Sequence, residues 1–227
     1  MPRDIVYILR EGIDPEELRY SLRSLDNFPH RFVWFVGGQP EGLTPDRRIK
    51  HKQQGPTKWD LIKSSLLRAI KEEELSASFF LFNDDFFIMR PQSGEFINFV
   101  DGTLADRIEQ FRKEDPWLKP YARTLYKAEQ ELKTLGATTW NFDVHLPMLL
   151  EKDKVGEVMR CSSPQVRSIY GNLTGCPHRQ HKDVKVYDFN KVPKCPDYLS
   201  TNDETFKRGK VGEYIRATFA RPSRFET

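Results

Sequence analysis

The sequence predicts an α/β protein with a mixed, mostly parallel central sheet flanked by helices. Three short apolar segments, DIVYILR (4–10), RFVWFVGG (31–38) and SFFLFNDDFFIM (78–89), have the length and residue types of buried strands. Helical patterns at 14–25 and 57–75 separate them. This strand–helix–strand–helix–strand order is typical of α/β sheets, in which consecutive strands run parallel.

The first helical segment carries the signals of a well-defined helix start. Asp14 can cap the helix, and Pro15 fits its first turn, where a missing N–H costs nothing. Leu18, Leu22 and Leu25 then recur at helical spacing. The pattern predicts a helix that packs one apolar face against the sheet.

The bulk composition is that of a globular protein. The chain has 227 residues, of which 38% are hydrophobic and 30% charged, and its formal net charge is +3. It contains no run of about 18 apolar residues, so we expect no membrane span. The N-terminal apolar stretch is too short for a signal peptide, so we expect a cytoplasmic protein. The three cysteines are an odd number and do not indicate a disulfide framework.

Two adjacent acids, Asp84 and Asp85, lie within the third apolar segment, where its strand should end. Ligands of open α/β sheets bind at the carboxyl ends of strands. Neighbouring side chains on a strand point to opposite faces, so one acid could hold a metal while the other contacts substrate. Mg²⁺ prefers a few carboxylates together with substrate phosphates. The alternative is a turn in which Asn83 and the acids cap a following helix.

A histidine in an apolar setting, His145 in FDVHLPM, is a candidate general base. Histidine accepts a proton near neutral pH, as activation of an acceptor hydroxyl requires. Asp143 precedes it by two residues, and would share its face in an extended segment, where it could orient the imidazole or hold metal. The alternative is a histidine that serves only the core.

A second group of residues has the chemistry of a structural zinc site. Three thiols and an imidazole would complete a tetrahedral site, formed by Cys161, Cys176, His178 and Cys195. Their spacing lacks a Cys-x-x-Cys pair, so unlinked thiols with surface histidines are the alternative.

Several stretches, taken in order, resemble the Stealth family of sugar-phosphate transferases, whose members build capsular polysaccharides or tag lysosomal glycoproteins. DIVYILR is similar to a degenerate first family region. EELRYSLRSL (16–25) and FLFNDDFFI (80–88) resemble the second region, and NFDVHLPMLLEKDKVGEV (141–158) resembles the third. TNDETFKRGKVGEYIRATFARPSRFE (201–226) is similar to the fourth.

This resemblance implies a GT-A-like nucleotide-sugar transferase fold and a divalent ion, Mg²⁺ or Mn²⁺. It also implies a single catalytic domain over residues 1–227. Within it, residues 1–100 would bind the nucleotide sugar, and residues 101–227 would supply the acceptor side and complete the motifs.

The resemblance, read with the chemistry of each residue, gives a set of expected site residues. The metal ligands would be Asp84, Asp85 and Asp203. The catalytic groups would be His145, Asp85, Asp143 and Arg167. The donor would contact Tyr7, Arg10, Gln39, Lys58 and Asn83.

Three of these expected residues have simpler alternatives. Lys58 opens a helix whose N-terminus favours anions, and the fork of Arg167 suits phosphate. Either could instead be a surface cation. Asp203 could instead cap the helix that follows it.

The expected reaction moves a sugar-1-phosphate from a nucleotide sugar, such as a UDP-sugar, to an acceptor hydroxyl. Ordinary glycosyl transfer that releases UDP is an alternative, because both reactions develop charge on phosphate oxygens. The acceptor could be a glycan, a protein glycan or modified DNA. A third alternative is a non-catalytic module that binds glycan or nucleic acid.

Overall fold

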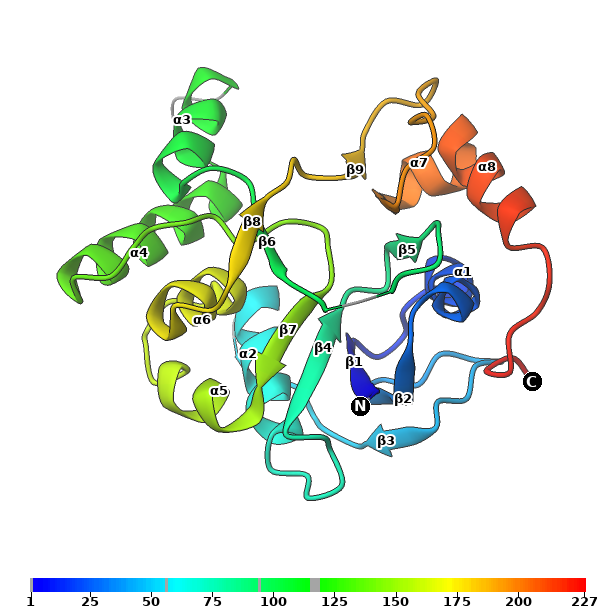
Figure 1. The fold of residues 1–227 in the computed structure, drawn as a ribbon, viewed down its shortest axis with the longest axis horizontal. Coiled ribbons are helices and arrows are strands. Elements are labelled where there is room, and N and C mark those ends of the chain that lie inside the picture. Colours follow the sequence, from blue (N-terminus) through cyan, green and yellow to red (C-terminus); the bar gives the residue numbers. More distant parts are fainter. Residues whose placement is uncertain (1, 56, 94, 115–118) are drawn as a thin grey trace.

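The structure is a computed structural model that describes residues 2–55, 57–93, 95–114 and 119–227. Its centre is a five-stranded sheet in the order β3-β2-β1-β4-β7, with helices on both faces (Figure 1). The strands are β1 (Arg3–Leu9), β2 (His30–Gly37), β3 (Arg47–Ile49), β4 (Ser78–Phe82) and β7 (Met148–Glu151). The predicted α/β class is therefore confirmed.

The central sheet is mixed, which corrects the expectation of a mostly parallel sheet. β1 pairs in parallel with both β2 and β4, and β2 pairs in parallel with β3. β7 instead runs antiparallel to β4, with Leu81 opposite Met148. Because β7 comes from the second half of the chain, both halves build this sheet.

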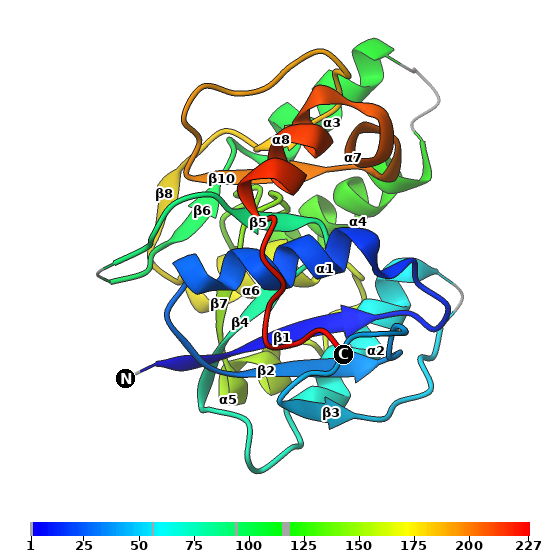
Figure 2. The same cartoon turned by 90° about the vertical axis from the view of Figure 1, so that its right-hand side faces the viewer.

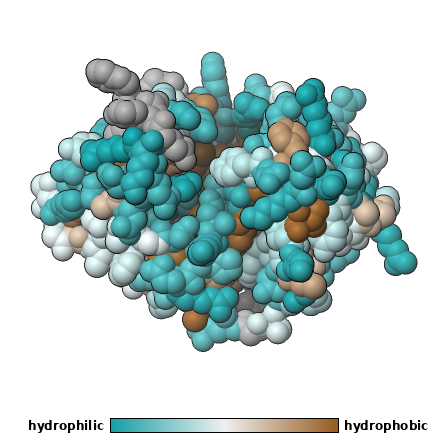
Figure 3. Space-filling model, turned by 90° about the horizontal axis from the view of Figure 1, so that it is seen from above, coloured by the Kyte–Doolittle hydropathy of each residue, from teal (hydrophilic) through white to brown (hydrophobic). Residues whose placement is uncertain are grey.

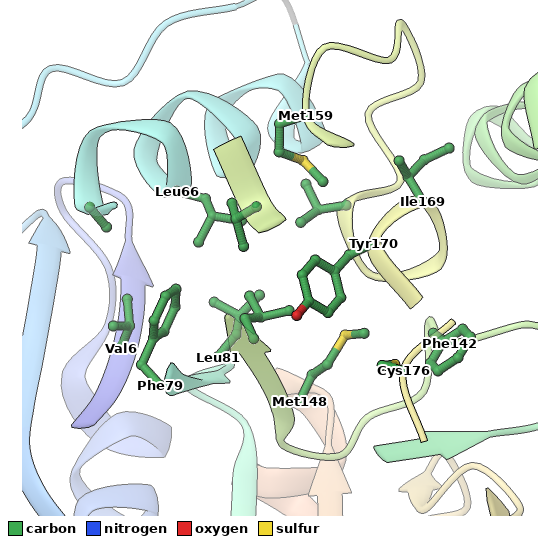
Figure 4. Packing of buried hydrophobic residues seen from close by; sticks show 14 of the residues in the cluster. Val6, Leu66, Phe79, Leu81, Phe142, Met148, Met159, Ile169, Tyr170 and Cys176 are labelled. Carbon is green, nitrogen blue, oxygen red and sulfur yellow. The ribbon is translucent and has the colours of Figure 1, made fainter. Parts of the chain in front are cut away.

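Alternation of side chains along β1 divides the core into two layers. Val6 faces one layer and packs in the same cluster as Leu66 of α2 (Lys58–Ala69) and Tyr170 of α6 (Val166–Thr174), as Figure 4 shows. Ile5, Tyr7 and Leu9 face the other layer, where they pack with Leu18 and Leu22 of α1 (Pro15–Ser24). The helices thus cover opposite faces of the sheet because alternate β1 residues are buried on each.

Smaller elements sit beyond the carboxyl ends of the parallel strands. A three-stranded sheet joins β5 (Phe86–Ile88), β10 (Tyr198–Thr201) and β9 (Lys185–Val186), and a two-stranded sheet joins β6 (Asn98–Val100) and β8 (His178–Gln180). In Figure 1, α3 (Leu104–Glu114) and α4 (Pro120–Thr134) lie on one side of these elements. On the other side are α7 (Asp203–Arg208) and α8 (Lys210–Thr218). The remaining helices are η1 (Leu25–Asn27) and α5 (Lys152–Val158).

The C-terminal segment returns across α1 toward the central sheet (Figure 2). Glu226 accepts hydrogen bonds from Arg23, at 2.7 and 2.8 Å, and from Arg19, at 3.0 Å. This network fixes the last residues against α1. None of the described helices has the length and apolar character needed to cross a membrane.

Candidate functional site

A cavity of about 950 Å³ opens where β1 and β4 end. Viewed from above, the molecule shows apolar residues between hydrophilic ones on this side (Figure 3). Several predicted site residues line the cavity, namely Lys58, Asn83, Asp84, Asp143, His145 and Arg167. The structure therefore brings together residues from the two halves of the chain.

The turn between β4 and β5 carries Asn83, Asp84 and Asp85. Asp84 lines the cavity directly. Asp85 forms an ion pair with Lys185, whose Nζ lies 2.7 Å from Oδ2. The other oxygen, Oδ1, is buried and has no hydrogen-bond partner within the described residues. A buried carboxylate oxygen of this kind is costly unless a ligand compensates it.

The acids of this turn repel one another and a nearby acid of α1. Burial, followed by the charge of Asp85, raises the pKa of Asp84 to about 6. Glu17 of α1 belongs to the same group, because burial and then the charges of Asp85 and Asp84 raise its pKa to about 8. A hydrogen bond from Thr201 Oγ1 to Glu17, at 2.7 Å, only partly offsets these effects. Sequence reasoning missed Glu17, since an acid in a first helical turn is explained by the helix dipole alone.

The third predicted metal ligand, Asp203, is exposed at the first residue of α7. Its charge contributes to the raised pKa of both Glu17 and Asp84, so it lies within electrostatic range of the acids. The helix cap is Asn202, whose side chain accepts from the backbone of Thr205. Capping therefore does not explain Asp203.

The oxygen chemistry of this acidic group suits a hard divalent cation such as Mg²⁺ or Mn²⁺. The buried, unpartnered Oδ1 of Asp85 and the raised pKa values of Asp84 and Glu17 are the features that such a cation would relieve. Across the described ranges, no three His, Cys, Asp or Glu side chains converge closely enough to form a ready-made metal site.

The imidazole of His145 is held by Asp183 and not by Asp143, which corrects the expected orienting residue. Nδ1 of His145 lies 2.9 Å from both carboxylate oxygens of Asp183, and the backbone N–H of His145 also donates to Asp183, at 3.1 Å. Burial alone would raise the pKa of Asp183, but the hydrogen bonds and charge of His145 lower it to about 2. The second ring nitrogen, Nε2, bonds to no described residue and belongs to a ring that lines the cavity.

Asp143 has a different partner among the residues that line the cavity. Tyr121 of α4 donates its hydroxyl to Asp143 at 2.5 Å. Burial and then the charge of Asp143 raise the pKa of Tyr121 well above its ordinary value, so the phenol keeps its proton. This bond attaches α4 to the cavity wall.

Helix α6 positions the segment that carries Asp143 and His145. Asn172 accepts a hydrogen bond from the backbone N–H of Trp140 and donates one to its carbonyl, both at 2.8 Å. A Cβ on Gly171 would lie 2.4 Å from the ring of Phe142, so only glycine allows this close packing. The close packing of α6 against Phe142 therefore fixes the position of the segment that carries His145.

Arg167 is buried at the start of α6. It donates to the carbonyl oxygens of Leu146, at 2.7 Å, and Leu81, at 3.3 Å, and to the side chain of Asn83, at 3.2 Å. Burial lowers the pKa of its guanidinium, and the charges of Asp143 and Asp85 oppose that shift. Arg167 thus joins the end of β4 to the His145 segment while its charge faces the cavity.

Lys58 lies at the rim, at the N-terminus of α2. Thr57 and Asp60 cap this helix reciprocally, and Lys58 Nζ lies 5.0 Å from the centroid of the Trp59 ring. Arg107 and Lys119 also line the cavity, so the rim gathers three cations. A positively charged rim favours an anionic ligand.

Three predicted donor contacts do not line the cavity. Tyr7 points to the α1 face, where its ring is fully buried and its hydroxyl lies 2.9 Å from Ser21 Oγ. Because side chains alternate along β1, Ile8 lines the cavity instead. Arg10 and Gln39 are exposed beyond the ends of β1 and β2, and Gln39 donates to the carbonyl of Leu43.

The residues of the predicted zinc site have separate surroundings. Cys176 is buried and accepts a hydrogen bond from Asn98 at 3.3 Å, Cys161 is half-buried, and Cys195 is exposed; all three are free thiols. His178 Nδ1 lies 3.0 Å from the carbonyl oxygen of Cys176. The zinc site stays a prediction.

In comparisons with known proteins, no family model matches this chain, and no curated protein is significantly similar to it.

Proposed function

We propose that the chain is a metal-dependent transferase, with a GT-A-like fold, that moves a sugar-1-phosphate from a nucleotide sugar to an acceptor hydroxyl. One observation carries this proposal. His145, which Asp183 holds, lines one cavity together with Asn83 and Asp84 of the acidic turn, at the carboxyl ends of parallel strands. Ligands of open α/β sheets bind at such positions.

In the proposed reaction, Nε2 of His145 takes the proton of the acceptor hydroxyl as the oxygen attacks the donor. Asp183 keeps the Nδ1 proton in place and stabilises the positive charge that forms on the ring. The low pKa of Asp183 keeps its carboxylate charged throughout the neutral range. The imidazole is therefore prepared to act as a general base.

The divalent ion would be held by Asp84 and Asp85, with Glu17 and Asp203 nearby. When bound, it supplies positive charge that neutralises the diphosphate of the donor. Arg167 adds a buried positive charge at the cavity wall, and Lys58 adds one at the rim. Both stabilise negative charge that develops on phosphate oxygens.

The product distinguishes the two transferase reactions. Attack at the β-phosphate forms a bond between that phosphorus and the acceptor oxygen, breaks the bond to the bridging oxygen and releases UMP. Attack at the anomeric carbon releases UDP. The Stealth resemblance of the segments around Asp84 and His145 favours the first.

The experiment is a screen of UDP-sugars with Mn²⁺ or Mg²⁺, scored by release of UMP or UDP. His145→Asn should lose turnover, while the matched control His30→Asn, at the opposite end of the sheet, should keep it. A chain that turns over no nucleotide sugar and binds none would contradict the proposal. Steep salt-dependent binding of a polyanion, without nucleotide binding, would favour a binding module instead.

A further inference from the structure

Lys185 is a partly buried cation at the cavity that the proposed reaction does not use. Its side chain is 15% exposed and its Asp85 partner is 13% exposed, so their 2.7 Å ion pair is largely shielded from water. Ion pairs shielded in this way are screened much less by salt than surface pairs are. Lys185 is therefore a defined component of the site.

The chain fixes Lys185 through β9. This strand pairs in parallel with β10, and Lys185 stands opposite Ser200. Asp183 lies two residues earlier and reaches His145, while Lys185 reaches Asp85. One short segment thus supports both the histidine and the acidic turn.

The pairing of Asp85 is incomplete. Lys185 contacts Oδ2, whereas Oδ1 is buried without a hydrogen-bond partner within the described residues. Lys185 also forms the sole ion pair of Asp85 in that part of the chain. A lysine ammonium group is a compact point charge that a flexible stem can move, unlike the bidentate fork of arginine.

We propose that Lys185 is the resident counter-ion of Asp85 and competes with the divalent ion for this carboxylate. The inference rests on the proposed function, because it assigns Asp85 to the metal site. Two cations at one carboxylate repel each other, so the ammonium group at Oδ2 opposes binding of the ion even when the ion takes Oδ1. Lys185 therefore lowers the affinity of the site for the divalent ion. When that ion is absent, the ammonium group offsets the negative charge of Asp85.

The test is a calorimetric titration of the full chain with Mn²⁺ alone, with no nucleotide and no turnover. Lys185→Gln removes the competing charge, and it should bind Mn²⁺ about ten-fold more tightly than the wild type. Lys185→Arg keeps the charge and should bind Mn²⁺ no more tightly than the wild type. The exposed neighbour Lys182 gives the matched control Lys182→Gln, which should leave the affinity unchanged.

The outcomes separate this inference from the proposed function. Equal or weaker Mn²⁺ binding by Lys185→Gln, with normal binding by the wild type, overturns the competition and leaves the metal site intact. Tighter binding by Lys185→Arg overturns it as well, and this variant serves if Lys185→Gln does not fold. No Mn²⁺ binding by any of the proteins contradicts the metal centre itself, and the competition with it.

Discussion

Nδ1 of His145 lies 2.9 Å from both carboxylate oxygens of Asp183, although the two residues are 38 positions apart in the chain. Burial would raise the pKa of Asp183, yet the contacts with His145 hold it at about 2. The carboxylate is thus charged at every pH at which the imidazole can act as a base. The ring of His145 lines the same cavity as Asp84.

Asp183→Asn should lower turnover of the donor by about 10²–10⁴-fold, because the amide no longer fixes the ring and its proton as a carboxylate does. The measurement is the rate of UMP or UDP release at saturating donor. Asp188→Asn, on an exposed residue of the following loop, is the control and should keep the wild-type rate. Equal rates for both variants would remove Asp183 from the mechanism.

Glu17 should make the metal-free protein less stable as the pH rises. Below its ordinary pKa of 4.5, the carboxyl group is protonated in both the folded and unfolded states. Between 4.5 and about 8 the unfolded chain ionises first, so the free energy of unfolding falls as the pH rises. Above about pH 8 that contribution is fully lost.

Glu17→Gln should remove this pH dependence. The variant should be several kcal/mol more stable than the wild type at pH 8, with little difference at pH 4.5. Urea unfolding in the presence of a chelator measures it, with Glu213→Gln on the exposed face of α8 as the control. A constant difference across this pH range would show that Glu17 is not buried among like charges.

Arg167→Lys should destabilise the fold. Lysine cannot reproduce the hydrogen bonds from Arg167 to the carbonyl oxygens of Leu146 and Leu81, and each net bond contributes about 1 kcal/mol. We expect a loss of about 2 kcal/mol in urea unfolding, together with lower turnover. A variant of wild-type stability would mean that Arg167 does not brace the His145 segment.

Tyr7→Phe tests whether Tyr7 belongs to the core or contacts the nucleotide. Losing the hydrogen bond between Tyr7 and Ser21 should cost about 1 kcal/mol of unfolding free energy. The affinity for UDP should not change, because the ring lies on the α1 face of the sheet. Arg10→Ala and Gln39→Ala should likewise leave UDP affinity unchanged, and a ten-fold loss in any of the three would place the nucleotide elsewhere.

The sequence was sufficient to predict the strands β1 and β2 and the acids at the end of β4. The third predicted strand, over 78–89, is instead two strands, β4 and β5, joined by the acidic turn. The features that were predicted are local, because continuous apolar runs and turn residues can be recognised without knowledge of tertiary contacts. The resemblance to the Stealth family gave Asp84 and His145 as residues of one expected site, and both line one cavity. The antiparallel direction of β7 could not be predicted from the sequence, because it depends on the long connection through α3 and α4.

The missed residues depend on contacts between distant segments. Asp183 lies in a turn-rich stretch with no periodic pattern, and only the fold brings it to His145. Asp143 was preferred because it is near in sequence, but its partner is Tyr121 of α4. Tyr7 was assigned to the donor from its position near a strand end, whereas the alternation along β1 decides which face it occupies.

The most direct test is a crystal of the chain soaked with Mn²⁺ and UDP, in which anomalous scattering locates the ion. The account predicts Mn²⁺ at Asp84 and Asp85, with the diphosphate beside it in the cavity that His145 lines. An ion remote from these acids would contradict the account. So would UDP in the separate cavity of about 380 Å³ beside Phe28 and Phe80.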